Sequence, residues 1–318
     1  MATFEIWQEK YRPKSLDEII NQKHIVERLK AFVKEKNIPH MLFAGPAGCG
    51  KTTMAFSVAY ELYGEKWREN ILNLNASDER GIDVVRGKVK DFARTKSMSN
   101  VPFRLIFLDE SDALTPEAQQ ALRRTMETFS GISRFILAAN YSSRIIEPIQ
   151  SRCAVFRFTS LKDSDTREYI ERIEKGEKLK IDEGAKEAIV KLSEGDLRKV
   201  SNILQASAVL GKKITEDTIY EVSAKAEPKE VKKMIEHALS GKFVEARDIL
   251  KDVLLKRGVS GEDIIKQISS EIYELGISEK AKAELIEKVG EYEYRLQTGN
   301  DQIQLESMLA QFALHKKD

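Results

Sequence analysis

One stretch near the amino terminus constrains this chain more than any other. The residues Gly-Pro-Ala-Gly-Cys-Gly-Lys-Thr at 45–52 match the pattern G-x-x-x-x-G-K-[ST]. An apolar run at 41–44 precedes them and a helical pattern at 51–63 follows, so they have the strand–loop–helix context that this pattern requires. Glycines let successive backbone N–H groups point inward, and the N-terminus of a helix favours a bound anion. The stretch therefore predicts a loop that binds a polyphosphate.

The loop is expected to bind its ligand mainly through backbone groups and two side chains. The expected contacts come from Gly45, Pro46, Ala47, Gly48, Cys49, Gly50, Lys51, Thr52 and Thr53. Lys51 would reach the β- and γ-phosphates, and the Thr52 hydroxyl would bind Mg²⁺. The alternative is a glycine-rich turn between a strand and a helix that binds nothing.

Length and composition favour several domains. The chain has 318 residues, of which 42% are apolar and 32% are charged, and about 150 residues per domain is usual. A net charge of +1 gives no general attraction to nucleic acid or membranes, so any basic surface must be local. The two cysteines, Cys49 and Cys153, have no disulfide or metal-ligand spacing, and no run of 18 apolar residues occurs. We therefore expect a cytoplasmic protein without a membrane partner.

Strand and helix patterns divide the chain into three parts. Within residues 1–160, helical patterns alternate with apolar runs that resemble buried strands, at 41–44, 71–75, 105–108, 135–139 and 155–158. This alternation predicts a three-layer α/β domain with a mostly parallel sheet. Only helical patterns follow, which predict a small helical domain at 161–226 and an all-α bundle at 227–318. The apolar stripes of the bundle could pack within the chain or against other subunits.

Polar residues at the ends of two predicted strands are the candidate catalytic residues. Asp109 and Glu110 directly follow the apolar run at 105–108. There the first carboxylate can hold Mg²⁺ through water and the second can orient an attacking water. Asp112 is either a turn residue or a helper. Asn140 follows the next strand and could contact the γ-phosphate, although an Asn at a strand end is usually a turn former.

Basic residues outside the loop could also act on a nucleotide or on DNA. Arg152 could reach a neighbouring subunit's nucleotide as an arginine finger, or it could be a solvated surface residue. Arg198 could reach the phosphates from the helical domain, or it could be solvated beside a helix start capped by Asp196. A candidate set for contacts with DNA phosphates consists of Arg80, Arg86, Lys90 and Arg94. Such a charged stripe is more often only a solvated face.

Four longer motifs resemble the AAA+ ATPases and, within them, the archaeal-type small subunits of replication factor C, the clamp loader. They are WQEKYRP at 7–13, NASDERGID at 75–83, RRTME at 123–127 and IIEPIQSRC at 145–153. The resemblance runs along nearly the whole chain, and a generic ATPase would not share all four motifs. It implies a phosphate-loop ATPase domain, a helical lid domain and a helical collar that joins subunits.

The resemblance also implies roles for individual residues. It implies an adenine-side set of Tyr11, Arg12, Pro13, Ile19 and Ile20. It gives Asn140 the sensor 1 role and Arg198 the sensor 2 role, and it makes Arg152 the finger that acts on a neighbouring subunit. The helix that begins near Ile82 would follow DNA, and its far end, around Met98, would touch the clamp.

By this resemblance the chain would be an ATPase that uses ATP and Mg²⁺ to load a sliding clamp onto primer–template DNA. The implied partners are the large subunit of replication factor C, the clamp (PCNA), the DNA and further copies of the chain, with four small subunits to one large. A nucleoid-associated location in the cytoplasm would follow.

Two other functions remain open from the sequence. A branch-migration DNA helicase motor would share the loop, the acidic pair and both sensors, but would lack the motif at 75–83. A clamp-loader subunit that has lost hydrolysis is the non-enzymatic alternative, and the presence of Lys51, Glu110 and Arg152 argues against it.

Three positions depart from the family pattern. Ser111 stands where Ala is usual, but both preceding carboxylates are intact, so we expect activity to survive. Asn21 stands where Gly is usual, and Asn is one of the few other residues that tolerate a left-handed backbone. Cys49 is unusual in the loop, where binding uses its backbone N–H.

Overall fold

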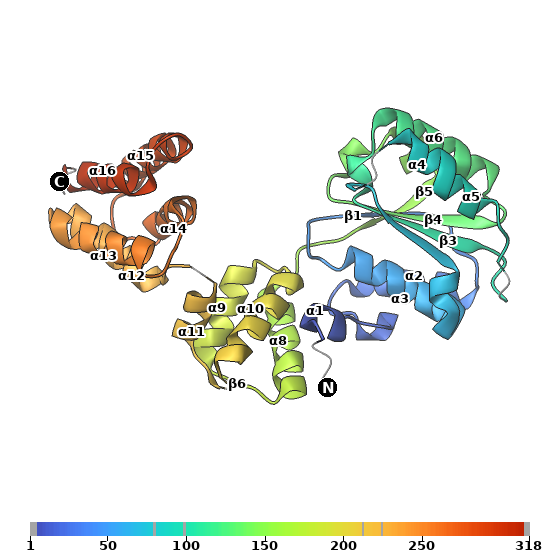
Figure 1. Ribbon diagram of the computed structural model, residues 1–318, viewed down its shortest axis with the longest axis horizontal. Helices are drawn as coiled ribbons and strands as arrows, with labels where there is room; N and C mark the ends of the chain where they lie inside the picture. The colour runs from blue at the N-terminus through green and yellow to red at the C-terminus, as the bar shows by residue number, and fades with distance from the viewer. Residues whose placement is uncertain (1–4, 79–80, 98–99, 212, 224, 315–318) are drawn as a thin grey trace. The chain divides into compact units, whose positions relative to one another are not determined.

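The computed structural model describes residues 5–78, 81–97, 100–211, 213–223 and 225–314 (Figure 1). The chain forms two compact units. The first contains the residues up to Glu177 together with Val190–Asn202, and the second contains Lys178–Ile189 together with the residues from Ile203 onward. The domain boundaries expected near residues 160 and 226 stay predictions.

A five-stranded parallel sheet organises the first unit, which confirms the expected α/β architecture. Its strands are β1 (His40–Ala44), β2 (Ile71–Asn75), β3 (Arg104–Asp109), β4 (Ser133–Ala139) and β5 (Cys153–Arg157). All pairings are parallel, and the strand order is β2-β3-β4-β1-β5. The central strands read as continuous apolar runs because helices cover both faces of the sheet.

Helices cover the two faces as separate layers, with α2 and α3 on one face and α4, α5 and α6 on the other (Figure 1). The α-helices here are α1 (Trp7–Lys10), α2 (Lys23–Lys34), α3 (Lys51–Tyr63), α4 (Ile82–Val84), α5 (Lys90–Ala93), α6 (Pro116–Thr128), α7 (Glu147–Gln150) and α8 (Asp163–Glu177). Shorter helices are η1 (Leu16–Glu18), η2 (Gly64–Glu69), η3 (Val85–Val89), η4 (Ser111–Ala113) and η5 (Ser142–Arg144). Alternate residues of β3 face the two layers: Phe107 packs with the α2–α3 layer and Ile106 with the other.

Local signals explain where α3 begins and ends and where α6 begins. Helix α3 starts after Gly50, whose φ is 95°, and ends before Gly64, whose φ is 60°. Both backbones are left-handed, a conformation that glycine adopts without steric cost. Helix α6 is capped by Thr115, whose hydroxyl accepts from the Ala118 N–H at 3.2 Å, and Pro116 is its first residue. The sequence predicted the Thr115 cap and the Pro116 start.

The predicted helix from residue 82 is interrupted. Between α4 and α5 lies η3, a π-helical turn at Val85–Val89. Val85 and Val89 are buried, as their spacing predicts, but a π turn bonds each residue to the fifth one along. The side chains that follow are therefore rotated relative to a regular α-helix.

The second unit is mainly helical but contains two short strands that the sequence analysis did not predict. Helices α9 (Glu183–Ser193) and α10 (Leu197–Leu210) contribute residues to both units. The remaining elements are β6 (Lys180–Ile181), β7 (Lys213–Ile214), α11 (Glu216–Val222), α12 (Pro228–Leu239), α13 (Phe243–Leu255), α14 (Gly261–Tyr273), α15 (Glu279–Leu296) and α16 (Asp301–Leu314). The expectation of helices alone was wrong, because two-residue strands are too short to produce a periodic pattern.

The apolar stripes of α12–α16 pack mainly against one another. Residues such as Ile235, Leu250, Ile268 and Leu309 are fully buried in a single cluster. This packing accounts for most of the stripes without a partner chain. Across the residues that the structure describes, no helix has the length and apolar character needed to cross a membrane.

His40, the first residue of β1, is a buried titratable group in the sheet. Its Nδ1 accepts a hydrogen bond from the Phe135 backbone N–H at 3.1 Å, which requires an unprotonated nitrogen. Burial, helped by the nearby Arg134 cation, lowers the pKa of His40 from 6.5 to about 4. Between these two pH values the unfolded chain binds a proton that the folded chain does not.

We therefore predict that folding stability falls as the pH drops from about 6.5 to about 4, by up to about 3 kcal/mol from this residue. NMR titration should give His40 a pKa near 4. In chemical unfolding experiments, the stability of the His40→Gln variant should depend less on pH than that of the unchanged protein. The Gln amide oxygen can accept the same hydrogen bond, and it does not titrate. A His40 signal that titrates near 6.5 would contradict this prediction.

Candidate functional site

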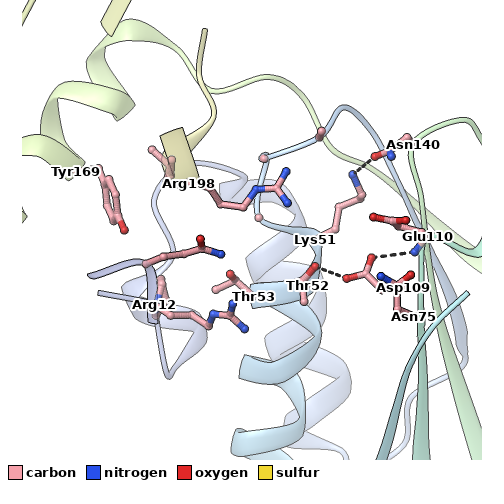
Figure 2. Close-up of a pocket in the computed structure, with 16 residues that line it drawn as sticks. Arg12, Lys51, Thr52, Thr53, Asn75, Asp109, Glu110, Asn140, Tyr169 and Arg198 are labelled. Carbon is pink, nitrogen blue, oxygen red and sulfur yellow. Dashed lines mark hydrogen bonds between the residues drawn. The ribbon is translucent and has the colours of Figure 1, made fainter. Parts of the chain in front are cut away.

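The carboxyl ends of four strands meet at one edge of the sheet and border a pocket of about 340 Å³ (Figure 2). This is the edge where ligands bind in open parallel sheets. The lining residues are Gln8, Arg12, Pro13, Ala47, Gly48, Gly50, Lys51, Thr52, Thr53, Asn75, Asp109, Glu110, Asn140, Tyr169, Leu197 and Arg198. The glycine-rich loop, the acidic pair and both expected sensor residues are therefore brought together.

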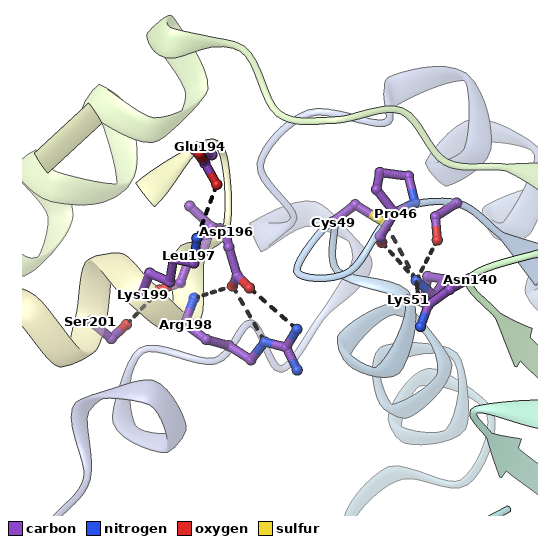
Figure 3. A network of polar contacts seen from close by, with 11 residues as sticks. Pro46, Cys49, Lys51, Asn140, Glu194, Asp196, Leu197, Arg198, Lys199 and Ser201 are labelled. Atoms are coloured by element: carbon purple, nitrogen blue, oxygen red, sulfur yellow. Dashed lines mark hydrogen bonds and ion pairs between the residues drawn. The ribbon is translucent and has the colours of Figure 1, made fainter. Parts of the chain in front are cut away.

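Lys51 is the buried cation of this pocket. Its Nζ donates to the carbonyl oxygens of Gly45 and Pro46, each at 2.7 Å, and to Oδ1 of Asn140 at 2.9 Å (Figures 2 and 3). Burial lowers the pKa of Lys51, while nearby carboxylates, including Asp109, oppose the shift. Asn140 reaches Lys51 because β4 lies between β1 and β3 in the sheet. The ammonium group has only neutral partners at these three positions, and phosphate oxygens would replace them favourably.

Thr52 and Asp109, which the sequence predicts as metal ligands, contact each other. The Thr52 hydroxyl donates to Oδ2 of Asp109 at 2.6 Å (Figure 2). Hydroxyl and carboxylate oxygens are hard ligands that suit Mg²⁺, which usually keeps several waters and binds substrate phosphates as well. Nowhere in the described part of the chain do three His, Cys, Asp or Glu residues gather as a metal cage. The pair fits a magnesium ion that the protein holds jointly with a nucleotide.

Glu110 occupies a strained turn at the end of β3. Its φ is 50°, a left-handed conformation that costs energy for a residue with a side chain. The buried Ser111 hydroxyl donates to the Leu108 carbonyl at 2.7 Å, and Oδ2 of Asp112 accepts from the Tyr141 N–H at 3.1 Å. These bonds hold the turn and leave the Glu110 side chain exposed at the pocket. Asp112 therefore fastens the turn, and the hydroxyl of Ser111 is satisfied.

Arg198 lies at the pocket beside the phosphate loop. Its guanidinium is paired with the Asp196 carboxylate at 3.3 Å, and its backbone N–H donates to Asp196 at 2.9 Å (Figure 3). Asp196 in turn packs directly on Gly48: a Cβ placed at Gly48 would lie 2.3 Å from Asp196 Cγ. The start of α10 thus rests on the loop, and Arg198 lies within reach of the space next to Lys51.

Some of the predicted binding residues that the structure describes do not line the pocket: Tyr11, Ile20, Gly45, Pro46 and Cys49. Gly45 packs against Phe158, where a Cβ would lie 2.5 Å from the carbonyl oxygen. The Cys49 side chain is buried, and this burial raises the pKa of its thiol. Ile20 is half-buried.

The amino-terminal arm, residues 7–21, is bonded to both ends of α8. The Tyr11 hydroxyl donates to Glu177 at 2.7 Å, and burial together with this carboxylate raises the pKa of Tyr11. Nδ2 of Asn21 donates to Asp165, also at 2.7 Å. Asn21 has a φ of 64°, which Asn tolerates better than most residues. These contacts place Arg12 at the pocket, while Tyr11 secures the arm.

Four lining residues were absent from the predicted site: Gln8, Asn75, Tyr169 and Leu197. Asn75 ends β2, so its place at a strand end was a usable signal. Gln8 lies next to the motif residues of the arm. Tyr169 and Leu197 come from α8 and α10, and no local pattern marks them as pocket residues.

Arg152 lies just after α7 and outside this pocket. Its side chain is 38% exposed. One guanidinium nitrogen donates to the Pro148 carbonyl at 2.7 Å, and the other pairs with Glu127 of α6 at 2.6 Å. The structure thus places Arg152 at a surface, away from the nucleotide pocket of its own chain.

The residues that the sequence predicts to contact DNA do not all lie at one surface feature. Arg86 and Lys90 line a groove of about 480 Å³, together with Arg124 from α6, which the sequence analysis did not select. Arg94 is exposed, lies outside that groove and pairs with Asp91 at 3.4 Å. Two expected contacts, Arg80 and Met98, lie outside the described residues.

Residues 41–161 match the ATPase family associated with various cellular activities (AAA). The parallel sheet, the glycine-rich loop and the acidic pair at its edge agree with this match, and the protein is therefore an ATPase of the AAA class. Residues 226–311 match the replication factor C C-terminal domain.

Full-length relatives narrow the class further. A replication factor C small subunit of Sulfolobus acidocaldarius is 55% identical over 98% of this chain and 96% of the relative. The replication factor C small subunit of Methanococcus vannielii is 53% identical over 97% of this chain and 98% of the relative. That of Thermofilum pendens is also 53% identical, over 98% of this chain and 98% of the relative. The chain belongs to the replication factor C small-subunit family.

Solved structures of a Holliday junction branch migration motor, RuvB of Thermotoga maritima, share the fold. One has a TM-score of 0.57 and 20% sequence identity, covering 81% of this chain and 91% of that chain. A variant of the same motor has a TM-score of 0.58 and 21% identity. This likeness establishes a common fold and does not favour the helicase alternative.

The contact between Gly48 and Asp196 gives a test of the pocket. Gly48→Ala would place a methyl group on the Asp196 carboxyl carbon, at a φ of 75° that alanine adopts unfavourably. We predict that nucleotide affinity, measured by calorimetry, falls by tenfold or more, since each 1.4 kcal/mol is a factor of ten. Gly290→Ala is the matched control, because its Cβ would meet open space on α15. Equal affinity of both variants would show that the loop adapts to the methyl group.

Proposed function

We propose that this chain is the small subunit of a clamp loader, which uses ATP to load a ring-shaped sliding clamp onto primer–template DNA. The observation that carries the proposal is family membership over nearly the whole chain, including the C-terminal domain at 226–311. The pocket supports it because it contains the acidic pair and the lysine that ATP hydrolysis needs. A subunit without hydrolysis would not need this set.

In this proposal the pocket binds ATP with Mg²⁺. Lys51 and the loop N–H groups bind the phosphates, and Thr52 and Asp109 hold the metal, which neutralises charge on the phosphate oxygens. Glu110 orients and polarises the attacking water, and the strained turn keeps its carboxylate exposed at the site. Asn140 acts as sensor 1 beside Lys51, with which it shares a hydrogen bond.

The remaining roles divide between the lid, the arm and a neighbouring subunit. Arg198 acts as sensor 2 from the lid, after exchanging Asp196 for phosphate oxygens. Arg12 lies on the adenine side, with Tyr11 fastening the arm. Arg152 completes the site of the next subunit as an arginine finger, and its exposed position outside its own pocket supports this trans role.

The proposed assembly contains one large subunit of replication factor C and four copies of this chain. It acts on the sliding clamp (PCNA) and primer–template DNA, in the cytoplasm at the nucleoid. We assign residues 1–160 to the ATPase domain, 161–226 to the lid and 227–318 to a collar that joins the subunits. Arg80, Arg86, Lys90 and Arg94 contact DNA phosphates without reading bases.

The proposal is tested with the purified chain in complex with its large subunit. We predict that clamp and primed DNA together stimulate ATP hydrolysis by about tenfold or more, because closure around both completes sites between subunits. Lys51→Ala in all copies should abolish the stimulation. ATP hydrolysis that is indifferent to clamp and primed DNA would refute the clamp-loader function.

The groove that contains Arg86 and Lys90 gives a separate test for DNA. Replacing both with Ala should weaken binding of duplex DNA equally across sequences and reduce the slope of log K against log salt by roughly 2, since each phosphate contact contributes about 0.9. The control replaces Lys266 and Lys280, exposed lysines of the helical bundle. An unchanged salt slope in the groove variant would show that this groove does not contact DNA phosphates.

A further inference from the structure

Glu127 connects a motif of unassigned role to the arginine finger. It is the last residue of the RRTME motif at 123–127 and lies near the end of α6. Its Oε1 is 2.6 Å from a terminal nitrogen of Arg152 and 3.6 Å from one of Arg123. Neither phosphate binding nor the DNA groove uses this carboxylate.

A second contact fixes the same guanidinium. The other terminal nitrogen of Arg152 donates to the Pro148 carbonyl at 2.7 Å. A guanidinium is planar and has five N–H donors, so two anchors set the direction of its plane. Within the described residues these are the hydrogen bond and the ion pair of the Arg152 guanidinium, and most of its N–H donors stay available to an external anion.

The two anchors belong to elements that are themselves locked together. Gln119 of α6 is buried, and its Oε1 accepts from the Ile146 N–H at 2.9 Å while its Nε2 donates to the Arg144 carbonyl at 3.0 Å. These bonds tie the residues just before α7 to α6. Glu127 therefore acts on Arg152 from a rigid support.

The exposure of the pair argues against a purely structural role. The side chains of Arg152 and Glu127 are 38% and 39% exposed, and a pair that is open to water contributes little to folding. Holding the guanidinium in one orientation, by contrast, removes motion that a reacting site would otherwise have to restrict. The pair therefore contributes by fixing the orientation of the Arg152 guanidinium.

We propose that Glu127 is a positioning residue that orients Arg152 toward the nucleotide of the neighbouring subunit. This inference rests on the proposed trans role of Arg152. Glu127 touches neither nucleotide nor water of hydrolysis, so its loss lowers the rate of hydrolysis in the neighbour while that site keeps its own phosphate and metal contacts.

The test uses mixed assemblies with the large subunit, in which cis and trans effects separate. Unchanged chains are combined with a roughly tenfold excess of silent chains that carry Glu110→Gln and hydrolyse no ATP. Any second substitution is placed on the silent chains alone. It can then alter the measured rate only through the sites of neighbours. The rate of an assembly whose small subunits are all the same silent chains is subtracted as the contribution of the large subunit.

The reference is Arg152→Ala on the silent chains. Silent chains make up about nine in ten of the small-subunit neighbours in this mixture, and the large subunit is one neighbour in every assembly. The rate per unchanged chain should therefore fall severalfold, the largest decrease that the mixture can show. Glu127→Gln should lower it by about twofold, with the KM for ATP nearly unchanged, because orientation and not substrate binding is lost. Glu127→Asp, whose carboxylate is too short to reach Arg152, should act similarly.

The matched control is Glu147→Gln, the same chemical change on an exposed residue of α7 that has no contact with Arg152 among the described residues. It should leave the rate unchanged. Sedimentation of each mixture confirms that the chains assemble.

The outcomes separate the two ideas. No decrease with Arg152→Ala would overturn the trans role itself. A decrease with Arg152→Ala but none with Glu127→Gln or Glu127→Asp would overturn the positioning role alone. An equal decrease with Glu147→Gln, or a rise in KM that accounts for the Glu127 effect, would also overturn it.

Discussion

The parallel direction of the five strands is the constraint on which this site depends. Because every strand ends at the same edge, residues from four separate segments meet there: the loop at 45–52, Asn75, Asp109 and Asn140. The strand order then decides the neighbours. With β4 between β1 and β3, the Asn140 amide lies next to Lys51 and shares a hydrogen bond with it.

The polar groups of the pocket satisfy one another. Lys51 is bonded to carbonyls of its own loop, Thr52 to Asp109, and Arg198 to Asp196. Unpaired polar groups in a half-buried pocket are costly, so these internal bonds are expected, and a nucleotide with its metal must exchange them. Glu110 differs from these residues, since its strained backbone leaves the carboxylate exposed at the site. This division fits the proposed roles, in which the binding residues are preformed and Glu110 stays accessible to act on water.

Much of the fold was predictable because its signals are local. Buried strands in a parallel sheet are continuous apolar runs, and all five were placed within a residue or two of their ends. The Thr115 cap likewise lies within one helical turn. The π turn at Val85–Val89 and the strands β6 and β7 were missed. Val85 and Val89 have the spacing of a regular helix, so the local pattern does not reveal the π turn, and the two strands are too short to show a period.

The sequence by itself determined the chemistry of this protein: a phosphate loop, an acidic pair at a strand end and the membership of a family, since these are properties of short contiguous segments. Only the tertiary structure decided which side chains share a site. Tyr169 joins the pocket, Arg124 joins Arg86 in the basic groove, and Glu127 meets Arg152. These residues lie far apart in the sequence, and their approach depends on strand order and helix packing, which no local period encodes.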